Sequence, residues 1–451
     1  MRASKLLRWI VACGLLLRVL LWCFQVVPAG DDGERYYTES HNLVMHGVFS
    51  TDTHAEPRPT AHDLPLWPGT MAGFLWVTGS KAATVRLAGA LNIALMFGAV
   101  LFLLSALGRP PFHADDRGKA VAAAILLFLP DSFPYSLFHM PDPMALFFLC
   151  GAIAFFFRGV YGGRGWLLAS AGAFGGAILS KPICLPVACA FFLTLPFLLN
   201  GALLRRCGWA LLCFVLMGLI LAPWFLRNKR AFGTAGLTTI SGTNLYSCNW
   251  NWMVQSWPEP KRSEALRQNA AIEAQANAHD LMTQSNILGA YAKKQLMAHL
   301  PDYALFTLQR HPRLYAGTGT VALLRYLGEE NACYALTKRT PQGNPTNDFS
   351  KRDLFVGWGF QVAAFTLLAL CYVAIVGGWA RGLRHAFASR HLLSHQSIAF
   401  GVAFGGVLLL AVVIGPVVAT RYRFIMIPFF AMLASLLFGG GKEDAEPLQA
   451  S

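Results

Sequence analysis

The stretch LLRWIVACGLLLRVLLWCFQVVPAGDD, residues 6 to 32, decides the class of the fold. Its apolar part runs from Leu6 to Val27, with Arg18 deep inside it. A helix rises about 1.5 Å per residue and needs about 20 residues to cross the hydrocarbon of a bilayer, so this run is long enough. A cleaved signal peptide is the alternative, but no small-residue cleavage site precedes the acidic pair Asp31–Asp32. The sequence therefore predicts a membrane span that ends just before that pair.

The composition extends this prediction to the whole chain. Its 451 residues are 55% hydrophobic and 13% charged, whereas about 25% of the residues are charged in soluble domains. A net charge of +14 would suggest nucleic acid as the partner of a soluble protein. Here much of that charge falls in short loops between apolar runs, as the positive-inside rule describes. We therefore expect membrane lipids, and no nucleic acid, among the partners.

Further apolar runs follow the first along the chain. They cover residues 83 to 107, 118 to 137, 141 to 160, 165 to 180, 182 to 200, 207 to 226, 353 to 377, 397 to 418 and 423 to 440. The sequence thus predicts an all-α polytopic membrane protein with about ten spans, in a range of about ten to twelve. Lys181–Pro182 divides one apolar stretch, and we expect two spans there rather than one span and a re-entrant piece.

The spans divide the chain into four parts. We expect an N-terminal transmembrane module over residues 1–226 that includes a first external loop at 28–82. A large external region follows at 227–352, then C-terminal transmembrane helices at 353–440 and a cytoplasmic tail at 441–451. With the N terminus in the cytoplasm, the Arg-rich short loops fall inside and both long polar segments fall outside. Function is expected in those two segments, since connectors of that length are uncommon unless they are functional.

The large external region has a helical composition. Residues 261 to 317 are rich in Ala, Gln, Glu, Leu and Lys, which favours two or three surface helices. Pro301 and Pro312 are expected to break them. Cys248 and Cys333 are the two Cys residues placed in this region, where an oxidising periplasm would allow a disulfide between them, and the sequence leaves both states open.

The first external loop carries a spaced set of residues. Asp32 is followed by Tyr36 and Asn42–Leu43, and later by the element Pro65–Leu66–Trp67–Pro68. An acidic pair beyond a span often only ends the helix and hydrates the interface. The spacing, however, resembles the first external loop of GT-C glycosyltransferases, in the branch of the protein O-mannosyltransferases and the lipid A aminoarabinose transferase.

Three later stretches resemble the same family and occur in the same order. They are SKP at 180 to 182, APWFLRNKRAFGTAGLTTISGTNLYSCN at 222 to 249, and RYRFIMIPFFAMLAS at 421 to 435. Each motif is weak alone, but together they cover most of the membrane domain. The resemblance implies the GT-C fold and an inverting glycosyl transfer from an undecaprenyl- or dolichyl-phosphate sugar to an acceptor hydroxyl.

The resemblance also implies a catalytic carboxylate. A neutral hydroxyl is a poor nucleophile, so a base must take its proton as the new bond forms. Alignment to Tyr36 and Asn42 favours Asp32 for this role, and Asp31 is the alternative because the register is ambiguous by one residue. Asp142 corresponds to a second acid of the family, although an N-cap role for this residue is as plausible.

The leaving lipid phosphate needs fixed positive charge at the outer face of the membrane. The residues expected to bind the donor phosphate are Arg58, Lys181, Arg227, Arg421 and Tyr422. Those expected to bind the rest of the substrates are Tyr36, Asn244 and Tyr246. Ordinary snorkelling at the interface is the alternative for Arg423 and Arg230, and less so for Lys181 in its apolar surroundings.

No cofactor is expected. The first loop holds His41, His46, His54 and His62 with Glu56 and Asp63. Their spacing matches no tight metal-ligand pattern, and a divalent metal site is therefore not predicted.

Two other functions compete with the enzyme. A polytopic transporter of lipid-linked or small substrates would show repeats and short external loops, and this chain shows neither. A catalytically inert membrane scaffold is disfavoured by the acid and the Arg residues at the expected places. The absence of eukaryotic extensions favours a bacterial inner membrane, with both termini cytoplasmic, the active site periplasmic, and a protein, lipid or envelope glycan as acceptor.

Overall fold

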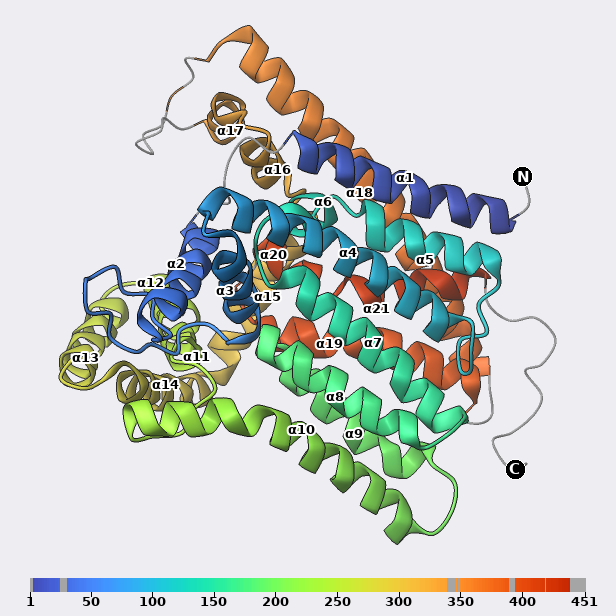
Figure 1. Ribbon diagram of the computed structural model, residues 1–451, viewed down its shortest axis with the longest axis horizontal. Coiled ribbons are helices and arrows are strands. Elements are labelled where there is room, and N and C mark those ends of the chain that lie inside the picture. The colour runs from blue at the N-terminus through green and yellow to red at the C-terminus, as the bar shows by residue number, and fades with distance from the viewer. Residues whose placement is uncertain are drawn as a thin grey trace.

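The computed structural model describes residues 3–24, 31–338, 346, 349–388, 394–417 and 419–438. The first half of the chain forms α1 (Ala3–Cys23), α2 (Asp31–His46), α3 (Leu66–Thr78), α4 (Lys81–Leu107), α5 (Asp116–Phe128), α6 (Ser132–Leu137), α7 (Asp142–Tyr161), α8 (Gly165–Ser180), α9 (Cys184–Leu198) and α10 (Leu203–Phe232). The second half forms α11 (Ile240–Asn244), the π-helix η1 (Leu245–Asn251), α12 (Trp252–Gln255), α13 (Lys261–Ala276), α14 (Leu281–Ala298), α15 (Leu300–Ala316), α16 (Thr320–Tyr326), α17 (Glu330–Thr337), α18 (Lys351–Ala388), α19 (His395–Ile414), α20 (Thr420–Phe424), α21 (Ile427–Ser435) and the 3-10 helix η2 (Leu436–Phe438). The all-α class predicted from the sequence is confirmed (Figure 1).

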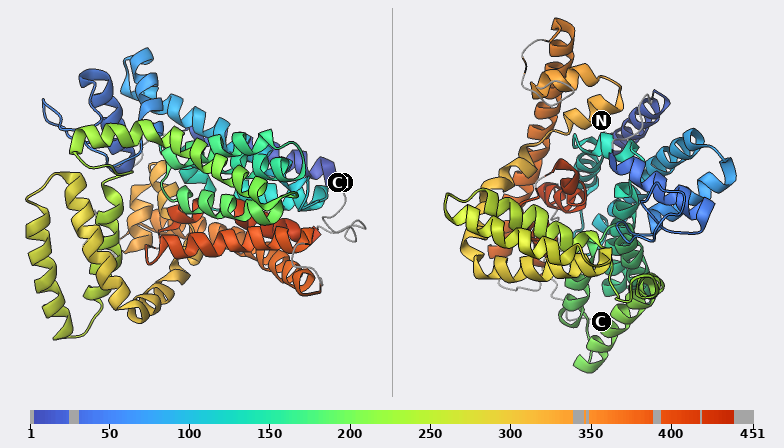
Figure 2. Two further views of the ribbon diagram at one scale, coloured as in Figure 1. Left: turned by 90° about the horizontal axis from the view of Figure 1, so that it is seen from below. Right: turned by 90° about the vertical axis from the view of Figure 1, so that its left-hand side faces the viewer.

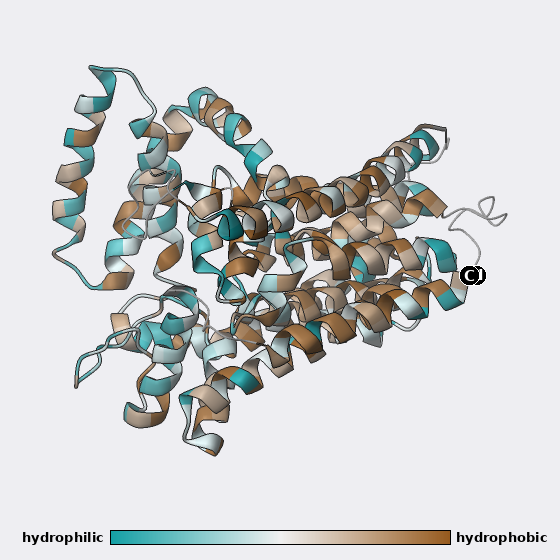
Figure 3. Ribbon diagram, turned by 90° about the horizontal axis from the view of Figure 1, so that it is seen from above, coloured by the Kyte–Doolittle hydropathy of each residue, from teal (hydrophilic) through white to brown (hydrophobic). Residues whose placement is uncertain are grey.

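Six of the described helices are long and apolar enough to cross a membrane, judged by length and composition: α1, α4, α7, α10, α18 and α19. The shorter helices α8 and α9 and the segment from α21 to η2 are also apolar. Figure 3 shows the consequence, since apolar residues dominate the bundle and polar residues gather at one end of it. This is the pattern of a multi-pass membrane protein.

One expected span is divided into two helices, and one expected break is confirmed. The run 118 to 137 is not one helix, because α5 ends at Phe128 and α6 begins at Ser132, with Pro130 and the buried Asp131 between them. The run 165 to 200 is two helices separated at Lys181–Pro182, as predicted. The number of membrane crossings stays a prediction.

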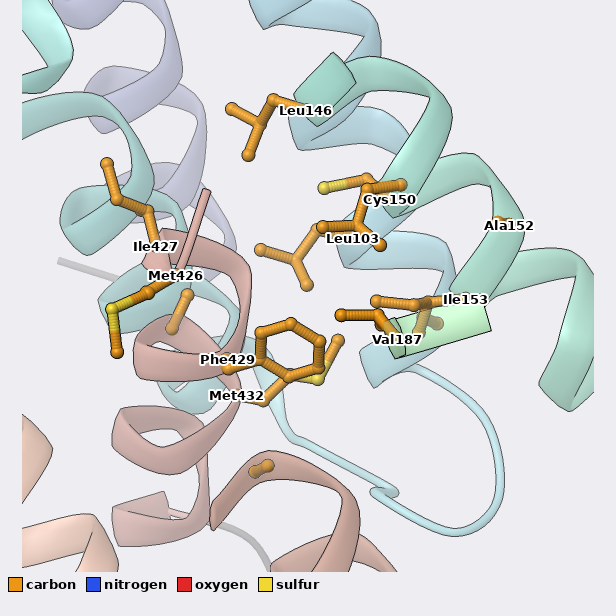
Figure 4. Close-up of a cluster of buried hydrophobic side chains, with 14 of the residues drawn as sticks. Leu103, Leu146, Cys150, Ala152, Ile153, Val187, Met426, Ile427, Phe429 and Met432 are labelled. Atoms are coloured by element: carbon orange, nitrogen blue, oxygen red, sulfur yellow. The ribbon is translucent and has the colours of Figure 1, made fainter. Parts of the chain in front are cut away.

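The bundle is held together by close packing of apolar helices. Contacts are densest where α7 meets α8 and α4, with further pairs between α1 and α5, α8 and α10, and α5 and α21. Figure 4 shows side chains that meet in this core, among them Leu103 of α4, Leu146 of α7, Val187 of α9 and Phe429 of α21. All four are at most 1% exposed, and such dense packing leaves the ends of the helices in fixed positions.

Small residues allow the C-terminal helices to approach closely. A Cβ atom added to Gly378 of α18 would lie 1.9 Å from the carbonyl oxygen of Leu433 in α21. A Cβ added to Gly406 of α19 would lie 2.2 Å from the ring of Phe429. These close crossings fix α21, and with it the preceding helix α20, against the bundle.

Arg18 is buried inside the bundle with its donors satisfied by neutral groups. Its guanidinium donates to the hydroxyls of Ser132 and Ser136, at 2.8 and 3.0 Å, and to three backbone carbonyls. These contacts join α1 to the broken α5–α6 segment. The charge in the first span is therefore a packing element of the fold, since a buried charge is tolerated only with such partners.

The segment 227–352, predicted to be external, contains three longer helices, α13, α14 and α15, which stand beyond the end of the bundle in the left view of Figure 2. The prediction of two or three surface helices is confirmed, with α15 starting at Leu300 beside Pro301. The expected break at Pro312 is wrong, because Pro312 lies inside α15. The carbonyl that loses its donor there belongs to Leu308, a residue that is 68% exposed.

The cysteines of this region do not pair. Cys248 lies in η1 and Cys333 in α17, and both are free thiols. The Cys333 thiol instead donates to the carbonyl of Val321, at 3.3 Å, inside a separate small apolar cluster. Of the two states that the sequence left open, a disulfide or two free thiols, the structure therefore has the free thiols.

Candidate functional site

A cavity of about 360 Å³ opens at the polar end of the bundle. Its walls come from α2, from the loop before α3, from the α8–α9 junction, from α11 and from α20. The lining residues that carry polar side chains are Asp32, Arg35, Tyr36, His62, Asp63, Trp67, Ser180, Lys181, Thr238, Ser241, Asn244, Arg421 and Tyr422. The volume falls in the range of small-molecule sites, which is about 300–1,000 Å³.

One face of α2 supplies the first wall. Asp32, Arg35 and Tyr36 are spaced by three and four residues, so they share a side of the helix. Arg35 Nη1 donates to Asp32 Oδ1 at 2.5 Å. The Tyr36 hydroxyl accepts from Arg421 Nη2 at 3.4 Å. The spacing of Asp32 and Tyr36 in the sequence motif therefore places both residues on the face of α2 that lines the cavity.

Arg421 joins α20 to both candidate acids. Its Nη1 donates to Asp32 Oδ2. Its Nε and Nη2 donate to Asp142 Oδ2 at 3.2 and 3.0 Å. A single guanidinium thus holds two carboxylates that are far apart in the sequence, and the three residues form the centre of the site.

Asp142 and Lys181 complete that centre. Asp142 is the first helical residue of α7, and the N-cap position before it is Pro141. Asp142 Oδ1 accepts from Lys181 Nζ at 2.5 Å. The carboxylate is 1% exposed and has two cationic partners. The N-cap alternative is therefore wrong, and Asp142 is an anchor for Lys181 and Arg421.

The electrostatics keep Asp32 ionised. Burial by itself would raise the pKa of this carboxyl, but the charges of Arg421 and Arg35 outweigh burial and hold the pKa below its ordinary value. Burial by itself would lower the pKa of Arg421, but the negative charges of Asp142 and Asp32 raise it well above its ordinary value. For Lys181, burial dominates and lowers the pKa of the ammonium despite its contact with Asp142.

A second ion pair, between Arg35 and Asp63, holds the partner of Asp32 in place. Arg35 Nε and Nη2 donate to Asp63 Oδ2 and Oδ1, at 2.6 and 3.2 Å. Asp63 Oδ2 also lies 3.2 Å from His62 Nδ1. Burial would raise the pKa of Asp63, but its hydrogen bonds to His62 and Arg35 lower it overall. Arg35 is therefore held by two carboxylates, one on each side.

Glu39 lies one turn further along α2 and is fully buried. Neither of its carboxyl oxygens has a hydrogen-bond partner within the described part of the chain. Burial and the nearby charge of Asp63 raise its pKa well above the ordinary value. This carboxyl is outside the cavity, and its environment favours the neutral form.

The opposite wall is neutral and rich in hydroxyl groups. Thr238 and Ser241 lie with their hydroxyl oxygens 2.8 Å apart, and Asn244 follows one turn later. A Cβ added to Gly242 would lie 2.0 Å from the carbonyl oxygen of Ser285 in α14, so only Gly allows this contact. The close contact with α14 thereby holds the hydroxyl wall in place.

The structure brings most of the predicted site residues together. Asp32, Tyr36, Lys181, Asn244, Arg421 and Tyr422 line the cavity. Asp142 reaches the same centre through its partners Lys181 and Arg421. Asp31 begins α2, and its side chain lies outside the described residues.

Other predicted residues lie elsewhere. Arg227 donates to the carbonyls of Thr60 and Phe49, at 2.7 and 3.0 Å, and so fastens the first loop to α10. Arg58 lies exposed in that loop. Tyr246 is buried against α13, with its hydroxyl donating to Glu273 at 2.8 Å.

Arg423 is also outside the cavity. It is fully buried and paired with Asp131, at 2.5 Å, and it donates to the carbonyls of Tyr315, in the last turn of α15, and of Gly317, just after α15. The snorkelling alternative is therefore wrong for this residue. Arg421 and Arg423 are two residues apart but have different roles, one in the cavity and one in the core.

Arg35 and the ion-pair role of Asp63 were not predicted from the sequence. The signal for Arg35 was its place one helical turn after Asp32, which puts both on one side of a helix. Nothing in the sequence joined Asp63 to Arg35, because they lie on separate segments of the loop. Within the described residues, no three His, Cys, Asp or Glu side chains gather as they would around a metal ion.

Comparisons with known proteins rest on structure. No protein-family model matches the chain, and no curated protein matches it in sequence. Among solved structures, the apo oligosaccharyltransferase of Archaeoglobus fulgidus aligns over 97% of this chain and 50% of its own, with a TM-score of 0.51 and 12% identity. ArnT of Cupriavidus metallidurans, in a structure with bound undecaprenyl phosphate, aligns over 95% of this chain and 76% of its own, with a TM-score of 0.40 and 18% identity.

At 12% identity, the likeness to the oligosaccharyltransferase shows a shared fold and does not show a shared function. The chain spans half the length of the oligosaccharyltransferase and nearly all of the chain takes part in the match. The chain has the all-α GT-C fold that its motifs predicted.

Proposed function

We propose that this protein is an integral membrane inverting glycosyltransferase, which moves a sugar from a polyprenyl-phosphate donor to an acceptor hydroxyl. The observation that supports this most is one cavity, at the polar end of an apolar bundle, that joins an ionised carboxylate to two cations. Asp32 is the carboxylate, and Arg421 and Lys181 are the cations. The shared fold with an oligosaccharyltransferase is consistent with this function.

Asp32 is proposed as the general base. It is the most exposed of the three cavity carboxylates, with 36% of its side chain accessible, so an acceptor hydroxyl can reach it. In the reaction, the acceptor oxygen forms a bond to the anomeric carbon while the bond from that carbon to the phosphate oxygen breaks. The bonding electron pair leaves with the phosphate, and the hydroxyl proton passes to Asp32. Attack from the side opposite the phosphate inverts the anomeric carbon.

Arg421 and Lys181 are proposed to bind the donor phosphate. Both line the cavity, and their side chains are 17% and 13% exposed. The phosphate gains negative charge as the glycosidic bond breaks, so fixed cations stabilise the transition state more than the ground state. Asp142 keeps both cations in place between turnovers, which makes it a positioning residue rather than a base. Tyr422 lies beside them, with its ring 5.9 Å from Lys181 Nζ.

The neutral wall of Thr238, Ser241 and Asn244 is proposed to contact the sugar. Hydroxyl and amide groups can both donate and accept hydrogen bonds, which suits the hydroxyl groups of a pyranose ring. Tyr36 lies across the cavity and completes the proposed sugar contacts. No metal ion or organic cofactor takes part in the proposed reaction.

The proposal extends to the cellular setting. The donor is undecaprenyl-linked and the acceptor is an exported protein, a lipid or an envelope glycan. The protein lies in a bacterial inner membrane, with both termini in the cytoplasm and the cavity open to the periplasm. The placement of positively charged loops opposite the cavity supports this orientation.

The test uses the purified full-length protein in detergent or nanodiscs. It is incubated with a panel of undecaprenyl-phosphate sugars that carry a radiolabel in the sugar, first with water alone as the acceptor. Slow release of free sugar from one donor identifies that donor without knowledge of the acceptor. Release that is lost in Asp32→Asn and retained in the exposed control Lys293→Gln of α14 would support the enzyme.

The same preparation separates the enzyme from a transporter. In proteoliposomes, a transporter would move an intact lipid-linked substrate across the membrane without release of sugar. Absence of sugar release from every donor, together with such movement, would refute the glycosyltransferase. Binding of undecaprenyl phosphate without either activity would leave only an inert scaffold.

A further inference from the structure

The Asp side chains in and next to the cavity balance its Lys and Arg side chains in charge; Asp142 does not line the cavity but pairs with two of its cations. Three carboxylates, Asp32, Asp63 and Asp142, face three cations, Arg35, Arg421 and Lys181, and all are joined by ion pairs. An anionic donor phosphate therefore meets no spare positive charge among these six groups. To bind, it must take a cation from a carboxylate that already holds it.

The geometry selects the cation that is released. Arg35 is fixed by both oxygens of Asp63 and does not turn easily. Lys181 has Asp142 as its ion-pair partner, and Asp142 is 1% exposed. A deeply buried carboxylate that loses a partner is strongly destabilised. Arg421 differs from these two cations, because its Nη1 contacts Asp32 and not a deeply buried carboxylate. Asp32 is 36% exposed, so water can replace Arg421 as its partner.

We propose that Arg421 is shared between Asp32 and the donor phosphate, so that donor binding takes Arg421 from Asp32 and releases this carboxylate to act as a base. In this arrangement, Asp32 is restrained by two guanidinium groups in the empty cavity and by one in the loaded cavity. A carboxylate paired with two cations is a poor proton acceptor, and it becomes a better one when one of them leaves. The base is therefore active when the donor is present.

The Arg35–Asp63 pair has a defined part in this exchange. When Arg421 turns to the phosphate, the hydrogen bond from Arg35 Nη1 to Asp32 Oδ1 remains, at 2.5 Å. Asp63 holds Arg35 through its other two nitrogen atoms. Arg35 and Asp63 are thus positioning residues that keep Asp32 directed into the cavity while Oδ2 is free to accept the proton.

The inference rests on the proposed function, and a binding experiment separates the two. The probe is undecaprenyl phosphate, and its dissociation constant is measured with the full-length protein in nanodiscs. If Asp32 competes with phosphate for Arg421, then Asp32→Asn binds the probe more tightly than the parent, although it cannot transfer sugar. An exchange of one partly exposed ion pair is worth up to about 1 kcal/mol, so we expect about a fivefold gain in affinity.

Asp63→Asn is the matched control. It removes one negative charge from the same cavity but does not touch Arg421. Simple relief of charge repulsion would tighten binding in both variants. Competition for Arg421 tightens binding in Asp32→Asn alone, whereas Asp63→Asn keeps the parental affinity and lowers the rate of sugar release, because Asp32 loses its positioning pair. Equal gains in both variants would overturn the proposal.

A double-mutant cycle gives an independent measurement. In an Arg421→Lys background the shared guanidinium is absent, so Asp32→Asn no longer improves affinity. Asp32→Ser removes the same charge and serves in place of Asp32→Asn if the latter does not fold, as judged by gel filtration and thermal unfolding. An improvement that persists in the Arg421→Lys background would also overturn the proposal.

Two further arms define the ligand. Inorganic phosphate at equal concentration shows whether the headgroup alone competes with Asp32, and phosphatidic acid shows whether any anionic lipid does. If the parent binds none of the three probes, the proposed function itself is refuted. If the parent binds undecaprenyl phosphate and Asp32→Asn binds it no better, the function stands and the exchange of Arg421 does not.

Discussion

The replacement of Arg421 by Lys tests the central cation most directly. It keeps the positive charge but removes the planar fork, which donates from Nε and Nη2 to Asp142 at 3.2 and 3.0 Å and from Nη1 to Asp32. A compact ammonium on a different stem cannot span both carboxylates. The substitution therefore separates the effect of charge from that of geometry.

The expected size of the effect follows from the contacts. A hydrogen bond to a charged group contributes about 1.5–3 kcal/mol, so loss of one guanidinium contact to the phosphate weakens donor affinity about tenfold to hundredfold. Asp142 keeps Lys181 as a partner at 2.5 Å. The fold is therefore expected to lose only about 1–3 kcal/mol, less than the cost of leaving a buried carboxylate alone.

The assay combines two measurements on the same preparation. Affinity for undecaprenyl phosphate is measured in nanodiscs, and thermal unfolding is followed in detergent. Arg423→Lys is the matched control, because Arg423 lies in the same short helix but is fully buried against Asp131 and away from the cavity. We expect Arg423→Lys to lower the unfolding temperature at least as much while leaving affinity at the parental level. Parental affinity in Arg421→Lys, or equal losses of affinity in both variants, would refute the reasoning.

Four further predictions follow from the site and the packing. Asp32→Asn should reduce sugar transfer by about 10² to 10⁴, the usual contribution of a general base, and parental turnover would exclude Asp32 from that role. Glu39→Gln should be more stable than the parent at neutral pH, because burial raises the pKa of Glu39 in the folded state. The parent therefore loses stability as the pH rises above the ordinary pKa of a Glu, about 4.3, and the variant does not. Unfolding curves at several pH values check this, and an advantage that does not grow with pH would contradict it. Gly378→Ala should destabilise the fold by about 1–3 kcal/mol, since its Cβ would overlap the carbonyl of Leu433, and an unchanged unfolding temperature would show that the crossing adjusts. Chelation with EDTA should leave turnover unchanged, and a loss restored by one divalent cation would place a metal in the reaction.

Much of the architecture could be predicted because the bilayer imposes a strong pattern. Long apolar runs and the Lys181–Pro182 break identify helices from composition alone. The same logic was wrong at Pro312, which lies inside α15 at a place where Leu308, the residue four positions earlier, is exposed. It was incomplete at residues 118 to 137, where Pro130 and Asp131 divide an apolar run into two helices.

The site was harder to predict than the fold. Asp32, Asp142, Lys181 and Arg421 were found through motifs, and the structure joins them in one network. Positive charge at the end of a span was not enough to identify Arg227, which instead binds backbone carbonyls of the first loop.

The sequence by itself determined that the chain crosses a membrane, where the helices run, and which loop carries the acid, since these depend on local hydropathy and spacing. Only the tertiary structure decided which charges meet. Arg421 and Asp32 are 389 positions apart, and Arg421 and Asp142 are 279 apart. Arg421 lies in the cavity because folding brings Asp32 and Asp142 to it, whereas Arg423, two residues later, lies in the core beside Asp131. Packing decides which charges pair, because Coulomb attraction depends on the distance between two charges in space and not on their separation along the chain.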